Sequence, residues 1–184
     1  MKRKLIILVA VAALFVTAIA APVGAFGRRS LRAHMDLDFN LGIVTAQGDA
    51  QDVSWVGTLD FRGGTYDVVF RPTAPLVEHG DWVYFEENVR IYEPGTLSYT
   101  FNGLGEITAF TEGHVMVEFN EKGWLSSSRG TGFAWGKVAA TDADADPHGV
   151  LSNVDVGDRI FWYGRYLDET RMNWGGPFRI LTRG

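Results

Sequence analysis

The feature that most constrains the fold of this chain is the rhythm of turn-forming residues after residue 25. Glycine and other turn-forming residues recur about every eight to twelve positions, a spacing typical of short strands in all-β domains. Aromatic and β-branched residues fill the intervals, and nothing in this region has the pattern of a helix. The rhythm therefore predicts an all-β fold, either a barrel or a sandwich.

Residues 53–61 are the clearest predicted strand. Their alternate positions place one set of side chains on a single face: Val53, Trp55, Gly57, Leu59 and Phe61. This two-residue period indicates a sheet with one face buried. Gly63 and Gly64 then predict a tight turn, and Tyr66, Val68 and Phe70 belong to the return strand of a hairpin.

Further strands are predicted near residues 35–46, 82–92, 96–102, 106–112, 114–120, 131–140, 159–167 and 177–183. The connections are mostly short, which favours antiparallel neighbours. No shift in composition divides the chain, so residues 26–184 are predicted to form a single all-β domain.

This strand rhythm resembles that of the lipocalin-type proteins. The resemblance implies a small, closed, up-and-down antiparallel β-barrel, with a β-sandwich as the alternative. The Gly-x-Trp motif that opens lipocalins is missing near the start of the predicted domain. No residue role is therefore carried over from that family.

Residues 1–25 predict a helical signal peptide. Lys2, Arg3 and Lys4 precede a charge-free run, and small residues suited to cleavage stand at Ala18-Ile19-Ala20 and Val23-Gly24-Ala25. An uncleaved anchor is the alternative, because the run approaches the shortest membrane spans of about 17 residues. We expect a secreted or cell-envelope protein that meets a membrane only through an uncleaved signal segment.

Composition excludes some partners and some forms of stabilisation. The chain has a formal net charge of −5 at pH 7, and removal of the signal segment would take away basic residues but no acidic one. So acidic a chain is a poor candidate for binding nucleic acid. The sequence contains no cysteine, so stability comes from packing without disulfides.

No sequence pattern indicates an enzyme. His114 and Glu118 share a strand face but stand about 13 Å apart, too far for a hydrogen bond. Glu86 and Glu87 are adjacent and face opposite sides of a strand, which is wrong for a two-carboxylate glycosidase pair. An enzyme whose acidic residues converge only from different strands is one of three hypotheses for function.

An acidic loop at residues 142–149 is a candidate calcium site. A twelve-residue calcium loop that starts at Asp144 places Asp146 third, Gly149 sixth and Asp155 last. His148 at the fifth position is a poor calcium ligand, and no helices flank the loop. Structural calcium held by Asp144, Asp146 and Asp155 is one interpretation, and a solvated acidic loop is the other; no other cofactor is expected.

Aromatic residues provide the remaining two hypotheses. The chain contains 6 Trp, 6 Tyr and 12 Phe residues, and several predicted strands are apolar on both faces. The first hypothesis is a secreted, non-enzymatic barrel that binds a small apolar molecule inside, lined by Trp55, Tyr66, Phe70 and Trp162. The second is an extracellular sheet that binds glycans or a protein partner through Trp82, Tyr84, Phe161 and Tyr163.

Overall fold

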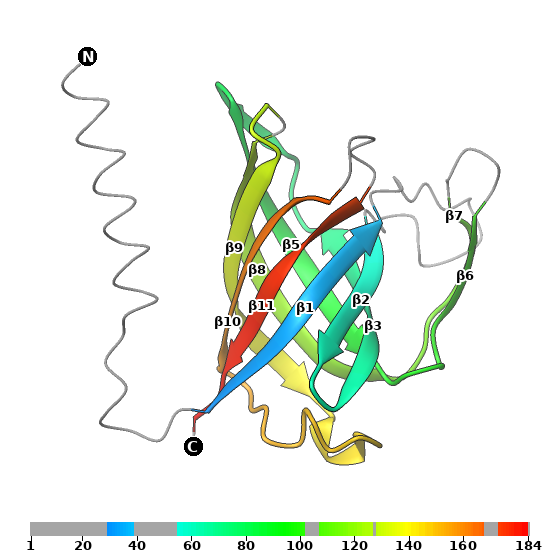
Figure 1. Cartoon of the computed structure of the whole chain (residues 1–184). Coiled ribbons are helices and arrows are strands. Elements are labelled where there is room, and N and C mark those ends of the chain that lie inside the picture. Colours follow the sequence, from blue (N-terminus) through cyan, green and yellow to red (C-terminus); the bar gives the residue numbers. More distant parts are fainter. Residues whose placement is uncertain (1–28, 39–54, 102–106, 127, 168–172, 184) are drawn as a thin grey trace.

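A closed antiparallel β-barrel of eight strands dominates the computed structural model (Figure 1). The structure describes residues 29–38, 55–101, 107–126, 128–167 and 173–183, so the signal peptide predicted for residues 1–25 lies outside the described residues. The barrel strands are β1 (Ser30–Asp38), β2 (Trp55–Phe61), β3 (Gly64–Pro72), β5 (Trp82–Tyr92), β8 (Val115–Ser126), β9 (Thr131–Thr141), β10 (Arg159–Tyr166) and β11 (Asn173–Leu181). Within the described ranges, no helix is long and apolar enough to cross a membrane.

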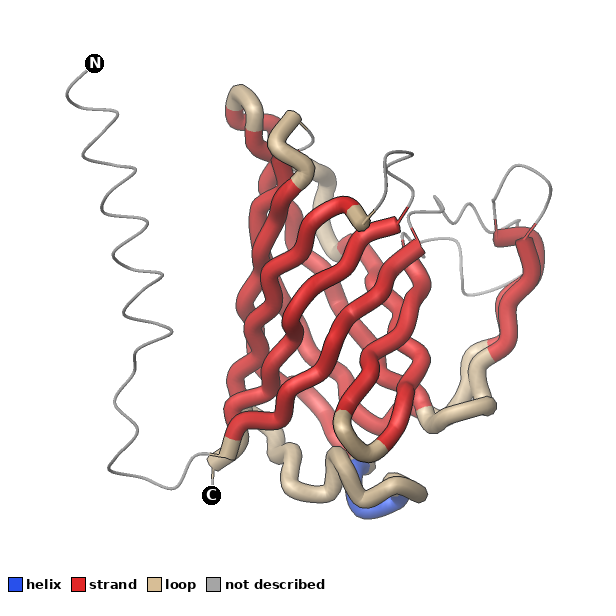
Figure 2. The backbone as a smooth tube through the Cα atoms, viewed as in Figure 1, coloured by secondary structure: helices blue, strands red, loops and turns tan. Residues whose placement is uncertain are grey.

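The barrel has a simple up-and-down topology. Each of its strands pairs antiparallel with the barrel strand that follows it in the chain, and β11 returns to pair with β1, where Leu181 lies opposite Ser30. Figure 2 shows the strands side by side around the barrel wall. The prediction of a closed antiparallel barrel is confirmed, and the sandwich alternative is wrong.

Short additional strands lie outside the eight-stranded barrel. β4 (Val77–His79) pairs with the start of β5, while β6 (Ser98–Phe101) and β7 (Ile107–Thr111) form a separate two-stranded sheet. Leu97, just before β6, packs with Val56, Val69 and Tyr92 in a second buried cluster. This outer cluster explains why β2 and β3 bury apolar side chains on both faces.

Large aromatic rings fill much of the barrel interior. The Trp55 ring lies 6.1 Å from Phe70 and 6.2 Å from Phe85, measured between centroids. Phe85 in turn stacks on Trp162 at 6.0 Å. An eight-stranded barrel is just wide enough for side chains to fill, and these contacts show how the aromatic residues of the sequence do so.

Inward-facing glycines make room for these rings. A Cβ atom built on Gly164 of β10 would overlap the Trp174 indole, with 2.5 Å to its Cε2 atom. A Cβ atom on Gly123 of β8 would lie 2.5 Å from Cζ of Phe85. The absence of a side chain at these positions is therefore a packing requirement of the barrel.

Gly164→Ala is expected to destabilise the protein by about 1–3 kcal/mol or more, because the buried Trp174 indole has little room to move. Urea unfolding measures the change. Trp174→Phe placed in the Gly164→Ala background supplies a smaller ring and is expected to recover part of the loss. Strictly additive costs of the two substitutions would contradict the clash.

β8 is longer than the strand predicted for this region. The sequence predicts a strand at 114–120 followed by a connector to residue 130, whereas β8 continues to Ser126. Gly123 resembles a turn residue in sequence, but it is part of the strand and accommodates Phe85. The β2–β3 turn also differs by one residue, since Phe61 pairs with Gly64 and the turn consists of Arg62 and Gly63.

Candidate functional site

Outward-facing side chains of β5, β8, β9, β10 and β11 form a continuous surface, which we call the outer face. Strand register arranges these side chains in rows across the sheet. The first row contains Tyr84, Trp124, Phe133 and Tyr163. The second contains Glu86, Lys122, Trp135, Phe161 and Arg179, and the third contains Asn88, Asn120, Lys137, Arg159 and Leu181. Neighbours within a row are about 4.8 Å apart, and successive rows about 7 Å.

The rings of the outer face form an aromatic platform. Trp135 is 41% exposed and Tyr163 is 38% exposed. Phe133 stacks against Trp135 with a centroid distance of 6.0 Å and an interplanar angle of 17°. The Lys122 ammonium lies 6.0 Å from the Trp135 ring centroid, within reach of a cation–π contact. The platform therefore presents flat apolar rings beside positive charge.

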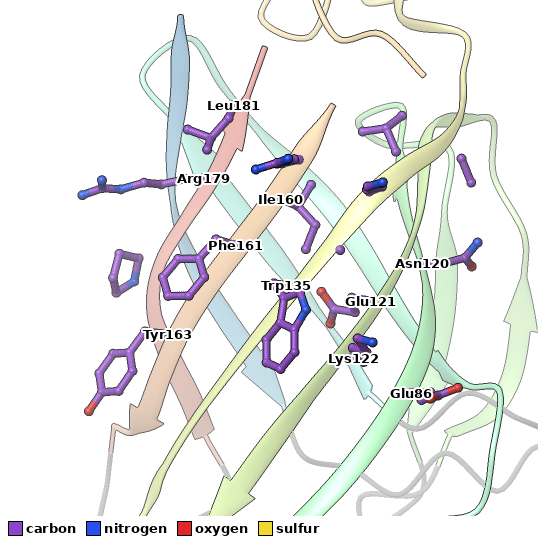
Figure 3. A pocket seen from close by; sticks show the side chains of 16 residues that line it. Glu86, Asn120, Glu121, Lys122, Trp135, Ile160, Phe161, Tyr163, Arg179 and Leu181 are labelled. Atoms are coloured by element: carbon purple, nitrogen blue, oxygen red, sulfur yellow. The ribbon is translucent and has the colours of Figure 1, made fainter. Parts of the chain in front are cut away.

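An open pocket of about 1200 Å³ lies over the second and third rows (Figure 3). Its rings are Trp135, Phe161 and Tyr163, and its cations are Lys122, Lys137, Arg159 and Arg179. Apolar surface with a few well-placed polar groups is typical of ligand-binding pockets. The outer face is therefore the candidate binding site.

The residues predicted to bind a glycan or partner lie on the outside of the sheet. Phe161 and Tyr163 line the pocket, while Tyr84 belongs to the first row and donates its hydroxyl hydrogen bond to Glu86 at 2.6 Å. Trp82 lies 6.1 Å from Phe133. The structure thus gathers all four near one aromatic surface.

The residues predicted to line an interior ligand site are all buried inside the barrel. Trp55 contacts Phe70 directly, and Trp55 and Trp162 both contact the same phenylalanine ring, Phe85. Tyr66 is placed near the end closed by residues 142–158, where its hydroxyl donates to Asp146 at 2.7 Å. Binding of an apolar molecule among these residues stays a prediction.

Two carboxyl groups lie side by side within the barrel. Glu87 of β5 and Glu121 of β8 are directly opposite in register and only 2% and 4% exposed. The Trp162 indole N–H donates to both Glu121 oxygens, at 2.9 and 3.0 Å. The Oε2 atom of Glu87 has no hydrogen-bond partner among the described residues.

Burial favours the protonated forms of this acid pair. Loss of hydration raises the pKa of Glu121 to about 8, against the opposing effect of the Trp162 hydrogen bond. Burial, followed by the charge of Glu121, raises the pKa of Glu87 well above its usual range. At neutral pH the barrel therefore holds protons on carboxyl groups that would be ionised in water.

This pair meets one requirement of the enzyme hypothesis, which needs acids from different strands to converge. Both side chains are almost completely buried, although Glu121 is among the residues that line the outer pocket. His114 makes a second acid contact, with 3.1 Å from its Nδ1 to Glu93 and 2.8 Å from its Nε2 to Asp142. These hydrogen bonds, that of Asp142 first, raise the pKa of His114, and the bridge ties together the ends of β5, β8 and β9.

The three candidate calcium ligands are not brought together. Asp144 and Asp155 are exposed, whereas the Asp146 carboxylate accepts hydrogen bonds from the Tyr66 hydroxyl and from the backbone N–H groups of His148 and Leu151. In the described part of the chain, no group of three or more His, Asp or Glu side chains could hold a metal ion. Structural calcium stays a prediction.

Asp146 instead closes one end of the barrel. Burial by itself would raise the pKa of Asp146, but hydrogen bonds from Leu151, Tyr66 and His148 together lower it. Leu151 and Val154 of the same loop are buried in the core cluster. The aspartate therefore anchors the loop to a tyrosine inside the barrel.

Sequence reasoning missed the β8 and β9 side chains of the outer face. Lys122 and Trp124 fall in the region predicted as a connector, and apolar and polar residues alternate only over residues 117–120. Glu121, a polar residue at an inward-facing position of β8, interrupts the pattern that would have indicated a longer strand. In comparisons with known proteins, no family model, curated protein or solved structure matches the chain.

Proposed function

We propose that this protein is an extracytoplasmic, non-enzymatic binding module that holds a glycan on its outer face. The observation that carries the proposal is the exposed aromatic platform around Trp135 and Tyr163. The C–H faces of sugar rings pack on flat aromatic faces, while the sugar hydroxyl groups need polar neighbours. Tyr and Trp side chains suit such contacts, because each combines an apolar ring with an O–H or N–H group that can face water.

The strands behind the platform support this proposal. Trp135 and Phe161 lie opposite each other on hydrogen-bonded strands of a closed barrel. A site carried by rigid strands loses little conformational freedom when it binds, which favours affinity.

The barrel interior is the weaker candidate for the binding site. Trp55, Phe85 and Trp162 already contact their neighbours there, so an interior ligand would have to displace buried rings. A glycan on the outer face needs no such rearrangement. The signal-like pattern of residues 1–25 supports placing this encounter outside the cytoplasm.

Trp135→Ala is expected to lower affinity for a bound oligosaccharide at least tenfold, because aromatic side chains at the centre of an interface commonly contribute 1.4 kcal/mol or more. Screening the exported protein on a glycan array identifies the oligosaccharide, and titration calorimetry then measures the change. Tyr163→Phe keeps the ring and is expected to retain most of the affinity.

Val156→Ala is the matched control, since Val156 is also exposed but lies outside the outer face. It is expected to bind like the wild type. Unchanged affinity of Trp135→Ala for every oligosaccharide that the array identifies would contradict the proposed site.

A further inference from the structure

Positive charge is concentrated on the outer face of an otherwise acidic chain. The chain contains 22 acidic residues, yet Lys122 and Lys137, the only lysines after residue 25, both line the outer pocket. Arg159 and Arg179 line it as well. This distribution does not follow from composition, because acidic residues outnumber basic ones.

Register places some of these cations directly opposite one another. Lys137 pairs across the strands with Arg159, and Arg179 pairs with Arg32 of β1. Like charges in directly opposite positions destabilise a sheet. Two such pairs on neighbouring strands mean that this wall of the barrel carries repulsion that an anionic ligand would relieve.

The protein's own acids do not neutralise these cations. Among the described residues, Lys137, Arg159 and Arg179 form no salt bridge with an acidic side chain. Glu86 lies opposite Lys122, and its carboxylate also accepts the hydrogen bond of the Tyr84 hydroxyl. The positive field of Lys137, Arg159 and Arg179 is therefore the part left available to a ligand.

A smaller pocket extends the same surface toward the end of the β8–β9 hairpin. It has a volume of about 450 Å³ and is lined by Arg129, Arg165 and the hydroxyl-bearing Ser128 and Thr131. Tyr163 lines both pockets, so the two are contiguous. Guanidinium groups bind carboxylate, sulfate and phosphate oxygens with good geometry.

We propose that the outer face selects an acidic polysaccharide, a chain of sugar rings that carry carboxylate or sulfate groups. This inference rests on the proposed glycan-binding function and names its ligand class. In the second row, Phe161 and Trp135 are flanked by Arg179 and Lys122. The Cα atoms of these two basic residues are about 14 Å apart by strand spacing. Sugar rings stack on the central rings, and their acidic groups meet the flanking cations.

The test compares charged oligosaccharides with neutral counterparts of the same backbone. The probes are oligogalacturonate against its methyl ester, and dextran sulfate against dextran. Titration calorimetry at 50 mM salt is expected to show at least tenfold tighter binding of a charged member than of its neutral partner. The difference is expected to shrink at 0.5 M salt, because screening weakens exposed charge pairs.

Arg159→Gln combined with Lys137→Gln removes one like-charge pair and is expected to abolish most of the preference for the charged probe. Thermal melting checks folding, and this variant is expected to be at least as stable as the wild type because the repulsion is gone. Arg62→Gln, an exposed arginine in the β2–β3 turn, is the matched control and is expected to keep the preference.

Each result separates the inference from the function on which it rests. Equal binding of charged and neutral members would overturn the acidic-ligand inference and leave glycan binding intact. If the protein binds neither the charged nor the neutral probes, the acidic-ligand inference is overturned. If the glycan array also shows no hit, the proposed glycan-binding function is overturned as well. Binding only to phosphatidylglycerol vesicles would overturn both in favour of an anionic membrane surface.

Discussion

The double variant Glu87→Gln/Glu121→Gln is expected to be slightly more stable than the wild type at pH 5 and clearly more stable at pH 8 and above. Glutamine has nearly the shape of a protonated glutamic acid and does not titrate. At pH 5 the folded wild type holds both carboxyl groups in their protonated form. The pH is only slightly above the pKa of the unfolded glutamates, so the advantage of the variant is still small there.

The direction of the effect follows from the raised pKa values. The pKa of Glu121 rises from 4.5 to about 8 on folding, and that of Glu87 also rises well above 4.5. Between these limits the unfolded chain releases protons that the folded barrel retains. Each retained proton lowers the free energy of unfolding of the wild type by up to about 1.4 kcal/mol per pH unit. The double variant does not lose stability in this way, because glutamine does not titrate.

Urea unfolding followed by tryptophan fluorescence from pH 5 to pH 9 measures the difference between the two proteins. Glu86→Gln is the matched control, because the adjacent Glu86 is exposed on the outer face. Its pH profile is expected to parallel that of the wild type. Parallel profiles for the double variant would show that the buried pair does not hold protons into this pH range.

The barrel could be predicted because its local patterns agree with its tertiary structure. The strand predicted at 82–92 has the same bounds as β5, and the opposite orientations expected for Glu86 and Glu87 place one outside and the other inside. Short connections between alternating strands leave few alternatives to an antiparallel meander. The pairing of β1 with β11 closes the barrel by joining the first and last described strands. No local sequence pattern indicates this pairing.

The acid pair could not be predicted from sequence, because it depends on register between strands that the β6–β7 sheet separates in the chain. Alternation within β5 does place Glu87 in line with the apolar Phe85 and Val89, which was a sign of burial. Its partner Glu121 falls in the region predicted as a connector, as does Gly123. Gly123 is required because the Phe85 ring inside the barrel leaves no room for a side chain, and not because of its backbone conformation.

Asp146→Ala is expected to destabilise the protein by about 3 kcal/mol or more at neutral pH. The substitution leaves the buried Tyr66 hydroxyl and the Leu151 N–H without their acceptor, and an unsatisfied buried donor costs about 1–3 kcal/mol. A loss of 3 kcal/mol corresponds to a fall in Tm of about 10 °C for a chain of this size. Tyr66→Phe removes a single donor and is expected to cost about 1 kcal/mol.

The pH dependence of this loss has the opposite sign to that of the acid pair. The pKa of Asp146 is lowered on folding, so its contribution is present above the pKa of the unfolded chain and disappears as pH falls through the lowered value. The stability difference between the wild type and Asp146→Ala is therefore expected to shrink at strongly acidic pH.

Melting with calcium and with a chelator then separates an anchor from a metal site. If Asp146 acts only as a hydrogen-bond anchor, Asp146→Ala lowers Tm equally with calcium and with the chelator. Substitution of the exposed Asp144 by alanine then changes Tm little in either condition. As a calcium site, both substitutions lower Tm only when calcium is present, because a bound ion stabilises the folded state alone. The hydrogen bonds that Asp146 already accepts from Tyr66, His148 and Leu151 favour the first outcome. A calcium-dependent loss in both variants would overturn the anchoring role.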